Sequence, residues 1–497
     1  KTFGSKGEVR VAIAHDSRNQ SDVFARKTAE VMSANGIRVF LFKALRPTPE
    51  LSFAIRHLKC QGGVVVTASH NPKEYNGYKV YFDDGAQVVN PHDKNIIAEV
   101  RKIRSMNEVA SAPDESLIVP IGEEIDKAYF EKLKTLSISP EIIRQQKNLS
   151  IVYTPIHGAG VTAVPEALRL FGFENVNVLA SQSKPDGNFP TVIYPNPEEA
   201  EALSLAIAEA EKTGAELVLA TDPDTDRVGA AVRDESGKFV LLNGNQTGSL
   251  LIYYLIEAWK RAGKLNGNQY IVKTIVTTDL TSEIAKKYGV ECLNVLTGFK
   301  YIAEVLRERE GKKEFIGGGE ESYGYLAGDF VRDKDAVSAA CLIAELTAWA
   351  KDQGRTPFTL LKQIYREFGF YKEGLVSITK KGKSGAEEIV AMMKNLRAQP
   401  PKTLAGQKVL RAMDYQNRVE KDLVSGKEKP IHLPASDVLQ FALEDGSLIT
   451  ARPSGTEPKI KFYFSVRGEL KNEKDYERVN AELDKKIEGI RQELRLN

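Results

Sequence analysis

One pattern recurs along most of this chain. A short apolar run rich in β-branched residues ends abruptly in a polar loop that carries glycine or proline, and a helical stretch usually follows. Continuous apolar runs of this length are typical of strands that are buried on both faces of a sheet. Strands that alternate with helices through short loops predict parallel α/β units. The predicted strands are residues 9–14, 63–66, 150–153, 216–220, 270–277 and 314–316.

The six predicted strands form three successive pairs, which predicts three similar α/β domains with mixed, mostly parallel sheets. We expect these domains at residues 1–145, 146–250 and 251–370. The remaining residues, 371–497, have a different texture and predict a smaller α+β domain. Its expected strands are 375–379, 445–450 and 460–465, followed by a charged amphipathic helix at 472–494. The four domains are expected to surround a central cleft.

Two helices of the first domains have recognisable ends. Ser21 is a candidate N-cap for a helix at 22–34, which Gly36 would terminate. A second helix is expected at 198–212, ending before Gly214.

Length and charge narrow the function classes. A chain of 497 residues is too long for one hydrophobic core. Its 69 basic and 67 acidic residues are spread along the chain without a basic stripe, which disfavours nucleic acid as a partner. The most apolar stretch, 337–350, is too short to cross a bilayer, so no membrane partner is expected. The three cysteines lie far apart and are expected to be bystander thiols in a reducing compartment, so a cytoplasmic protein is expected. A monomer or a homodimer is expected.

A serine directly follows one buried strand. In the sequence Thr-Ala-Ser-His-Asn-Pro at 67–72, Pro72 enforces a turn and His70 is adjacent to Ser69. Such a serine can act as a nucleophile if a neighbouring group takes its proton. The lipase-type G-x-S-x-G elbow and the S-x-x-K motif are both missing here, and serine is common in ordinary turns. This loop alone therefore leaves catalysis and simple turn chemistry as alternatives.

The loop after the strand at 216–220 is strongly acidic. In Asp-Pro-Asp-Thr-Asp-Arg at 222–227, alternate residues of an extended loop would point to one side and bring three carboxylates together. Oxygen ligands of this kind select Mg²⁺ or Ca²⁺. An EF-hand is excluded because Arg227 and Arg233 stand where that loop needs glycine and glutamate. An aspartyl-phosphatase motif would need threonine or valine where Asp226 stands. Metal binding remains the favoured interpretation.

Two further loops suit oxygen-rich ligands. Gly-Gly-Gly-Glu-Glu-Ser at 317–322 combines backbone freedom with carboxylates and a hydroxyl, which suits sugar hydroxyls. Arg-Pro-Ser-Gly-Thr-Glu-Pro-Lys at 452–459 offers a guanidinium and several donors to a phosphate. It lacks the P-loop pattern, so no nucleotide is implied. A nucleophile, a metal site, a polyol site and a phosphate anchor together predict phosphoryl transfer on a sugar phosphate.

These four loops resemble, in the same order, the motifs of the α-D-phosphohexomutases. The matching segments are 67–72, 222–227, 319–322 and 452–459, and supporting matches lie at 76–79, 297–300 and 333–335. The resemblance covers essentially the whole chain. It implies a four-domain intramolecular phosphotransferase that carries one Mg²⁺ and uses glucose 1,6-bisphosphate as intermediate and activator.

The resemblance also implies roles for single residues. Ser69 would carry the phosphoryl group, and Mg²⁺ would bind this phosphate together with Asp222, Asp224 and Asp226. Lys79 matches a family lysine implicated in proton transfer, and His70 and Lys334 are further catalytic candidates. Glu320 and Ser322 would hold the sugar, and the loop of Arg452 would hold the phosphate that is not reacting. The other substrate-binding candidates are Arg18, Arg227, Thr297, Gly298, Ser454, Gly455, Thr456 and Lys461.

The sugar loop continues as Tyr323-Gly324-Tyr325, which resembles phosphoglucomutases more than phosphomannomutases. This implies interconversion of glucose 1-phosphate and glucose 6-phosphate. Phosphomannomutase, phosphopentomutase, glucose-1,6-bisphosphate synthase and a catalytically silent scaffold with the mutase fold remain alternatives. Residues 3–7 echo the family's N-terminal glycine motif, but Val9 follows at once. The family's N-terminal segment and its active-site arginine are therefore expected to be absent.

Overall fold

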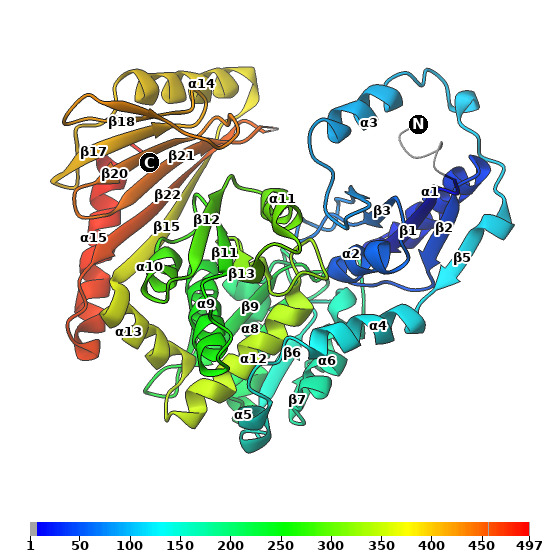
Figure 1. Ribbon diagram of the computed structural model, residues 1–497, viewed down its shortest axis with the longest axis horizontal. Coiled ribbons are helices and arrows are strands. Elements are labelled where there is room, and N and C mark those ends of the chain that lie inside the picture. Colours follow the sequence, from blue (N-terminus) through cyan, green and yellow to red (C-terminus); the bar gives the residue numbers. More distant parts are fainter. Residues whose placement is uncertain (1–6, 456, 497) are drawn as a thin grey trace. The chain divides into compact units, whose positions relative to one another are not determined.

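The computed structural model describes residues 7–455 and 457–496. The chain divides into two compact units. The first comprises Lys1–Lys273, Tyr288–Leu293 and Gly298–Leu360, and the second comprises Thr274–Lys287, Asn294–Thr297 and Leu361–Asn497. The four sheets are described below one at a time. Figure 1 gives the labels of the helices and strands.

The first sheet carries the serine loop. Its strand order is β4-β3-β1-β2-β5, parallel except for β4, which pairs antiparallel with β3. Apolar side chains of β1, β2 and β3 form a buried cluster with Ala25 and Ala29 of α1, while α2 also packs on β1 and β3. The strands are β1 (Arg10–His15), β2 (Arg38–Phe42), β3 (Gly62–Val66), β4 (Tyr78–Phe82) and β5 (Ile118–Ile121). The helices are α1 (Ser21–Ala34), α2 (Thr48–His57), α3 (His92–Val100), α4 (Glu123–Lys134) and α5 (Pro140–Gln145).

The second sheet carries the acidic loop. Its order is β10-β9-β8-β6-β7, with β7, β6 and β8 parallel and with β9 and β10 antiparallel to their neighbours. The strands are β6 (Ile151–Thr154), β7 (Val176–Val178), β8 (Leu217–Thr221), β9 (Val228–Arg233) and β10 (Phe239–Leu242). The helices are α6 (Val164–Phe171), α7 (Ala180–Ser183) and α8 (Ala200–Thr213). Every residue of β8 is buried, as its continuous apolar run predicts.

The third sheet has the order β12-β11-β13-β14, with β11 and β13 parallel and β14 antiparallel to β13. Its strands are β11 (Gln269–Thr274), β12 (Glu291–Val295), β13 (Glu314–Gly319) and β14 (Tyr325–Leu326). The helices of this part are α9 (Gly244–Arg261), α10 (Leu280–Lys287), α11 (Phe299–Arg309), α12 (Ala336–Asp352) and α13 (Pro357–Phe368). Nearly all of α12 is buried, which explains why its sequence is apolar all round.

The fourth sheet is antiparallel and follows the order β15-β22-β21-β20-β17-β18-β19, with β16 paired to β17. Helices α14 (Gly382–Ala398) and α15 (Tyr476–Glu493) pack against it. The strands are β15 (Phe370–Thr379), β16 (Thr403–Leu404), β17 (Gln407–Asp414), β18 (Val419–Asp422), β19 (Glu428–Pro430), β20 (Leu439–Leu443), β21 (Leu448–Pro453) and β22 (Lys459–Gly468). The predicted fold class, three α/β domains and a sheet-rich C-terminal domain, is confirmed.

All six predicted strands are present, but three local predictions are wrong. The strand expected to end at residue 277 ends at Thr274. The helix cap is Gln20, because the Ser21 hydroxyl donates instead to Asp16 Oδ1, 2.8 Å away. Residues 317–319 belong to strand β13 rather than to a loop. A Cβ on Gly318 would lie 2.3 Å from the carbonyl oxygen of Val272, so glycine permits close strand packing there.

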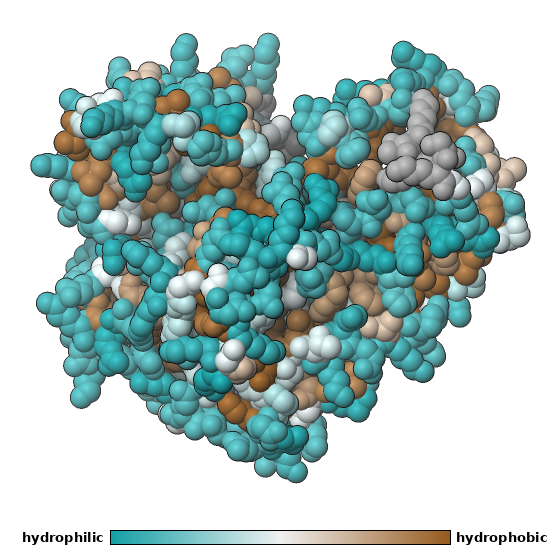
Figure 2. Space-filling view, in the orientation of Figure 1, coloured by the Kyte–Doolittle hydropathy of each residue, from teal (hydrophilic) through white to brown (hydrophobic). Residues whose placement is uncertain are grey.

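Polar side chains cover most of the face shown in Figure 2. Among the described residues, no helix is both long enough and apolar enough to cross a membrane. Of the three free cysteines, Cys60 and Cys341 are buried.

Candidate active site

Ser69 lies three residues after strand β3, in a turn with a positive φ of 52°. A residue other than glycine in this conformation is strained, at a cost on the order of 1 kcal/mol, and needs support from its surroundings. Its side chain is buried, at 9% exposure, rather than presented to solvent. The Ser69 hydroxyl donates to Asp222 Oδ2 at 2.7 Å, and its oxygen lies 3.2 Å from His70 Nδ1. The structure therefore joins the serine loop to the acidic loop.

Arg18 holds the serine loop from beneath. Its guanidinium is buried and donates to backbone carbonyls at 2.5 to 2.9 Å, with one further contact to Asn71. Its Nε lies 3.4 Å from Asp16 Oδ2. The bound carbonyls belong to Ser69, Asn71, Pro72 and Tyr75. Four terminal N–H groups that are spent on the backbone leave no terminal donor for a ligand, so this geometry supports a structural role for Arg18 rather than the expected substrate contact.

Asp16 continues this support to the nucleophile. Its Oδ2 accepts the Thr67 hydroxyl at 2.6 Å, and the Thr67 oxygen in turn accepts the Ser69 backbone N–H at 2.8 Å. Burial raises the pKa of Asp16, while the Thr67 hydrogen bond and the Arg18 charge act in the opposite direction. The strained turn at Ser69 is thus fixed by hydrogen bonds on both its N–H and its carbonyl.

The three carboxylates of the acidic loop converge, although not for the reason that the sequence suggested. The loop is a turn, with Thr225 in the left-handed region at φ 59° and its N–H donated to the Asp222 carbonyl at 2.9 Å. One carboxylate oxygen each of Asp222, Asp224 and Asp226 lies within 4.8 Å of the others, and all three residues are buried. An extended loop was therefore the wrong geometry for the right cluster.

Each carboxylate has one oxygen held by the protein. Asp222 Oδ1 accepts the backbone N–H groups of Asp226 and Arg227 at 3.1 and 3.0 Å. Asp224 Oδ2 accepts Lys79 Nζ at 2.6 Å, and Asp226 Oδ2 accepts the same ammonium at 3.0 Å.

The second oxygen of each carboxylate has few or no donors among the described residues. Asp224 Oδ1 and Asp226 Oδ1 are buried and have no hydrogen-bond partner among the residues that the structure describes. In the described part of the chain, the Ser69 hydroxyl is the single donor to Asp222 Oδ2. Buried carboxylate oxygens without donors are costly unless a cation binds them, and three hard oxygen ligands suit Mg²⁺. The residues present therefore fit the metal that the sequence predicts.

The cationic side chains around the loop affect its carboxylates differently: the pKa of Asp222 is raised, whereas that of Asp226 is lowered. Burial and then the neighbouring carboxylates raise the pKa of Asp222 well above its usual value. Burial also opposes ionisation of Asp226, but the ammonium groups of Lys334 and Lys79 outweigh it and lower the pKa of Asp226. Lys334 Nζ lies 3.2 Å from Asp226 Oδ2. Burial and then Arg227 lower the pKa of His70 to about 3, so its imidazole is neutral. Ser69 contacts His70 and Asp222, and Lys79 and Lys334 contact Asp226, so the predicted catalytic residues gather at the acidic loop.

Arg227 lies beside this cluster. Its guanidinium pairs with Glu198, and its Nε lies 3.9 Å from Asp226 Oδ1. Burial lowers its pKa, but Glu198 and the carboxylates outweigh this effect and raise it, so the group remains charged. A phosphate that approached Arg227 would compete with Glu198, a partner that the sequence did not indicate.

The structure joins two motifs that were expected to bind the sugar. Glu320 follows strand β13 directly and is 9% exposed. Its Oε1 accepts the N–H of Gly298 at 2.9 Å. Gly298 has a φ of 116°, which glycine adopts without strain. Ser322 is half-buried, and Thr297 is a half-buried residue of the second unit.

The expected phosphate loop belongs to the second unit and connects β21 to β22. Arg452 and Lys461 face each other in the register of these strands, which places two cations at the base of the loop. The Ser454 N–H donates to the Lys459 carbonyl at 2.7 Å, and Gly455 is exposed. Thr456 lies outside the described residues, as do residues 3–6 of the expected N-terminal motif.

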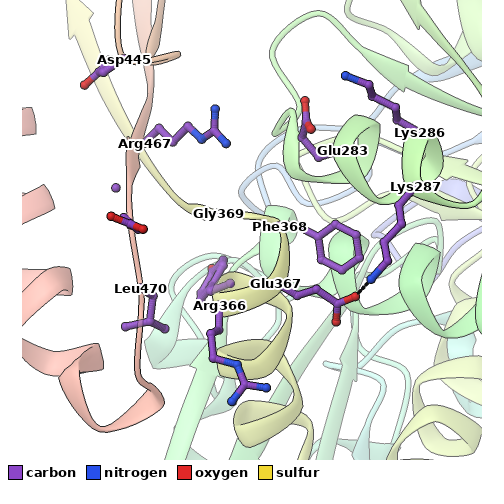
Figure 3. A pocket seen from close by; sticks show the side chains of 13 residues that line it. Glu283, Lys286, Lys287, Arg366, Glu367, Phe368, Gly369, Asp445, Arg467 and Leu470 are labelled. Carbon is purple, nitrogen blue, oxygen red and sulfur yellow. Dashed lines mark ion pairs between the residues drawn. The ribbon is translucent and has the colours of Figure 1, made fainter.

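A groove of about 840 Å³ also lies in the second unit (Figure 3). Residues of α10, the end of α13 and the end of β22 line it. Two of its cations are paired with acids: Lys287 with Glu367, and Arg366 with Glu473 at 3.3 Å. It contains none of the residues that the sequence singled out.

Besides Glu198, two residues of this site escaped the sequence analysis. Thr48, the first residue of α2, donates its hydroxyl to Asp224 Oδ2 at 2.8 Å. Asp16 anchors the serine turn, as described above. Asp16 follows a predicted strand just as Ser69 and Asp222 do, and that position was an available signal. Thr48 precedes a proline, and this pair is typical of an ordinary helix N-terminus, so the sequence carries no signal of a functional role there.

Comparison with known proteins agrees with this geometry. The sequence matches the family models described as "Phosphoglucomutase/phosphomannomutase, alpha/beta/alpha domain" I, II and III over residues 1–107, 127–237 and 243–368. It is 36% identical to a protein named "Phosphoglucomutase" from Staphylococcus haemolyticus over 96% of this chain and 86% of that protein. It is 40% identical to a protein named "Probable phosphomannomutase" from Haemophilus influenzae over 99% of this chain and 94% of that one.

Solved structures show the same fold. Parafusin (phosphoglucomutase) from Paramecium, in its open form, aligns with a TM-score of 0.69 at 19% identity, over 98% of this chain and 89% of that one. A phosphoglucomutase/phosphomannomutase family protein from Burkholderia thailandensis aligns with a TM-score of 0.67 at 20% identity, over 99% and 91%. With a buried serine hydrogen-bonded to an acidic triad and three matching domains, the chain belongs to the α-D-phosphohexomutase family of phosphoglucomutases and phosphomannomutases.

Proposed function

We propose that this protein is a phosphoglucomutase, which interconverts glucose 1-phosphate and glucose 6-phosphate through a phosphoserine at Ser69 and a glucose 1,6-bisphosphate intermediate. The observation that carries this proposal is the 2.7 Å hydrogen bond from the Ser69 hydroxyl to Asp222 in a buried acidic triad. A phosphoryl group carried by this hydroxyl would lie beside the carboxylates that would hold a metal ion.

The chain's own residues would position the reacting groups. Asp222, Asp224 and Asp226 would hold one Mg²⁺, which when bound neutralises charge on the transferring phosphoryl group. Lys79 and Lys334 would add positive charge beside Asp226 and, as ammonium groups, could donate a proton to the departing oxygen. The neutral imidazole of His70, 3.2 Å from the Ser69 oxygen, is the candidate acceptor for the proton of the attacking sugar hydroxyl. As the sugar oxygen forms its bond to phosphorus, the bond between phosphorus and Ser69 Oγ breaks; the sugar hydroxyl gives up a proton and the serine oxygen takes one up, so atoms and charge balance.

Binding of the sugar would use separate parts of the chain. Glu320 and Ser322 offer a carboxylate and a hydroxyl to sugar hydroxyls in either orientation. The loop with Arg452, Ser454, Gly455, Thr456 and Lys461 would bind the phosphate that is not reacting. In the proposed domains, 1–145 carries Ser69, 146–250 the metal loop, 251–370 the sugar loop and 371–497 the phosphate loop.

Substrate choice is the finer part of this proposal. Relatives of 36% and 40% identity carry both names, phosphoglucomutase and phosphomannomutase. The motif Gly-Glu-Glu-Ser-Tyr-Gly-Tyr at 319–325 favours glucose phosphates. Measuring kcat/KM with glucose, mannose and pentose phosphates decides this, and a higher value for mannose 1-phosphate would overturn the assignment to glucose.

The phosphoserine has a direct test. The purified protein is incubated with glucose 1,6-bisphosphate and Mg²⁺, and its intact mass is measured. We expect a gain of about 80 Da, the mass of one phosphoryl group, that is missing in Ser69→Ala. Ser236→Ala, an exposed serine in a surface turn, is the matched control and should keep the gain. A gain that persists in Ser69→Ala would show that another residue carries the phosphate.

A further inference from the structure

Thr48 makes two hydrogen bonds to a single residue of the acidic loop. Its backbone N–H donates to the Asp224 carbonyl at 2.8 Å, and its hydroxyl donates to Asp224 Oδ2 at 2.8 Å. Thr48 is fully buried, at 0% exposure. It belongs to α2, which packs on the first sheet, whereas Asp224 follows strand β8 of the second sheet. The contact therefore connects the domain of the serine to the loop of the carboxylates.

The local sequence gives Thr48 little freedom. It is the first residue of α2, between Pro47 at the N-cap and Pro49 in the first turn. Proline restricts both its own backbone and that of the residue before it, and a β-branched side chain has few rotamers. The N-terminus of α2 also carries a partial positive charge that favours a carboxylate. The hydroxyl is thus a preorganised donor aimed at Asp224.

Two donors fix the orientation of the Asp224 carboxylate. Lys79 shares its ammonium between Asp224 and Asp226, so it alone does not define either group. The Thr48 hydroxyl serves Asp224 alone and adds no charge. With Oδ2 held from both sides, Oδ1 is the oxygen that is left without a donor among the described residues, so it is the Asp224 oxygen available to a cation.

We propose that Thr48 is a positioning residue that orients Asp224 for metal binding and thereby sets the affinity for Mg²⁺. This inference rests on the metal site of the proposed function. Partners that orient metal ligands in this way contribute about 10- to 100-fold to metal affinity. The Thr48 hydroxyl and backbone N–H both donate to Asp224, so Thr48 would act through that residue.

The test measures metal binding directly, with Mn²⁺ as a paramagnetic probe of the Mg²⁺ site in the full chain. Thr48→Val keeps the shape and removes the hydroxyl, and we expect Mn²⁺ to bind about tenfold more weakly by electron paramagnetic resonance. Thr48→Ser keeps the hydroxyl and should bind nearly as the wild type does. Thr347→Val in α12 is the matched control, because it removes a buried hydroxyl whose acceptor is the Ile343 carbonyl. It should leave the Mn²⁺ affinity unchanged.

The second readout separates metal affinity from chemistry. In Thr48→Val, the Mg²⁺ concentration for half-maximal activity should rise about tenfold, while kcat at saturating Mg²⁺ and the KM for sugar phosphate stay close to wild type. If Thr48→Val does not fold, Thr48→Ala against Thr48→Ser isolates the same oxygen. Equal Mn²⁺ affinity in the variants with and without the hydroxyl, or an equal loss in Thr347→Val, overturns the proposal. Failure of the wild type itself to bind Mn²⁺ would instead refute the metal site of the proposed function.

Discussion

Arg18 offers the sharpest test of how the serine turn is held. Replacing it with methionine keeps an unbranched side chain of similar reach and removes the guanidinium. Four backbone carbonyls of the loop 69–75 then lose a charged donor, and Asp16 loses its cation at 3.4 Å in a buried position. Arg18→Lys is the matched variant, since it keeps the charge but a single ammonium cannot reach all four carbonyls.

The expected cost follows from these contacts. Breaking a buried ion pair by removing one partner destabilises a protein by about 3–5 kcal/mol, because the other charge stays buried and unpaired. For a domain of this size, such a loss lowers the melting temperature by roughly 10–20 °C. Arg18→Lys should lose about half as much, since hydrogen bonds to a charged group contribute about 1.5–3 kcal/mol.

Calorimetry and hydrogen exchange provide the assay. The chain has several domains, so the shift of the earliest melting transition is the relevant quantity rather than one free energy of unfolding. Amide exchange in residues 67–77 should rise in Arg18→Met before that of strand β6 does. A melting temperature within about 2 °C of wild type, with unchanged exchange in the loop, would refute the clamp. A raised KM in Arg18→Lys without loss of stability would instead support a substrate contact.

Three further predictions test other parts of the site. Gly244→Ala should destabilise the chain by about 1–3 kcal/mol, because its Cβ would lie 1.8 Å from the Glu321 carbonyl oxygen, whereas Gly489→Ala in α15 should stabilise it slightly; thermal melting compares the two. Burial raises the pKa of Asp335 from about 3.8 to about 6 in the folded state, so its contribution to stability is present at low pH and is lost as the pH rises through this range. The melting temperature of Asp335→Asn relative to wild type should therefore increase from pH 4 to pH 6, and a constant difference would contradict the assignment. Asp224→Asn should raise the Mg²⁺ requirement at least tenfold in a titration of activity, while sugar-phosphate binding measured by calorimetry changes little.

The elements and loops that the sequence predicts correctly depend on local patterns. Continuous apolar runs identified the six strands, since a strand buried on both faces has no polar alternation. Polar residues directly after these strands pointed to Ser69 and the three aspartates, because ligands bind at the carboxyl ends of parallel strands, and the fold brings these side chains together. The family followed from four motifs in order.

The features that the sequence missed depend on partners far along the chain. The orientation of Arg18 is set by carbonyls more than fifty residues away, as the 51-residue separation from Ser69 shows. Ser21 would suit an N-cap by residue type, but the buried Asp16 carboxylate competes for its hydroxyl. Glu198 belongs to no motif that would predict a contact with Arg227. Only the packed fold brings the two side chains together.

The acidic loop has a consequence for the order of folding. Its backbone is held by groups from the domains of the first and third sheets. The Thr48 N–H donates to the Asp224 carbonyl, the Ala336 N–H donates to the Thr225 carbonyl at 3.3 Å, and the N–H of Val228, next to the loop, donates to the Tyr323 carbonyl at 3.1 Å. All three aspartates follow a strand of the second sheet. These hydrogen bonds, however, form only when segments that precede and follow this sheet in the chain have docked. A nascent chain that has emerged only as far as β10 would contain every carboxylate of the triad but not the geometry. The acidic loop would therefore become able to bind a cation only late in synthesis, after the neighbouring domains have assembled around it.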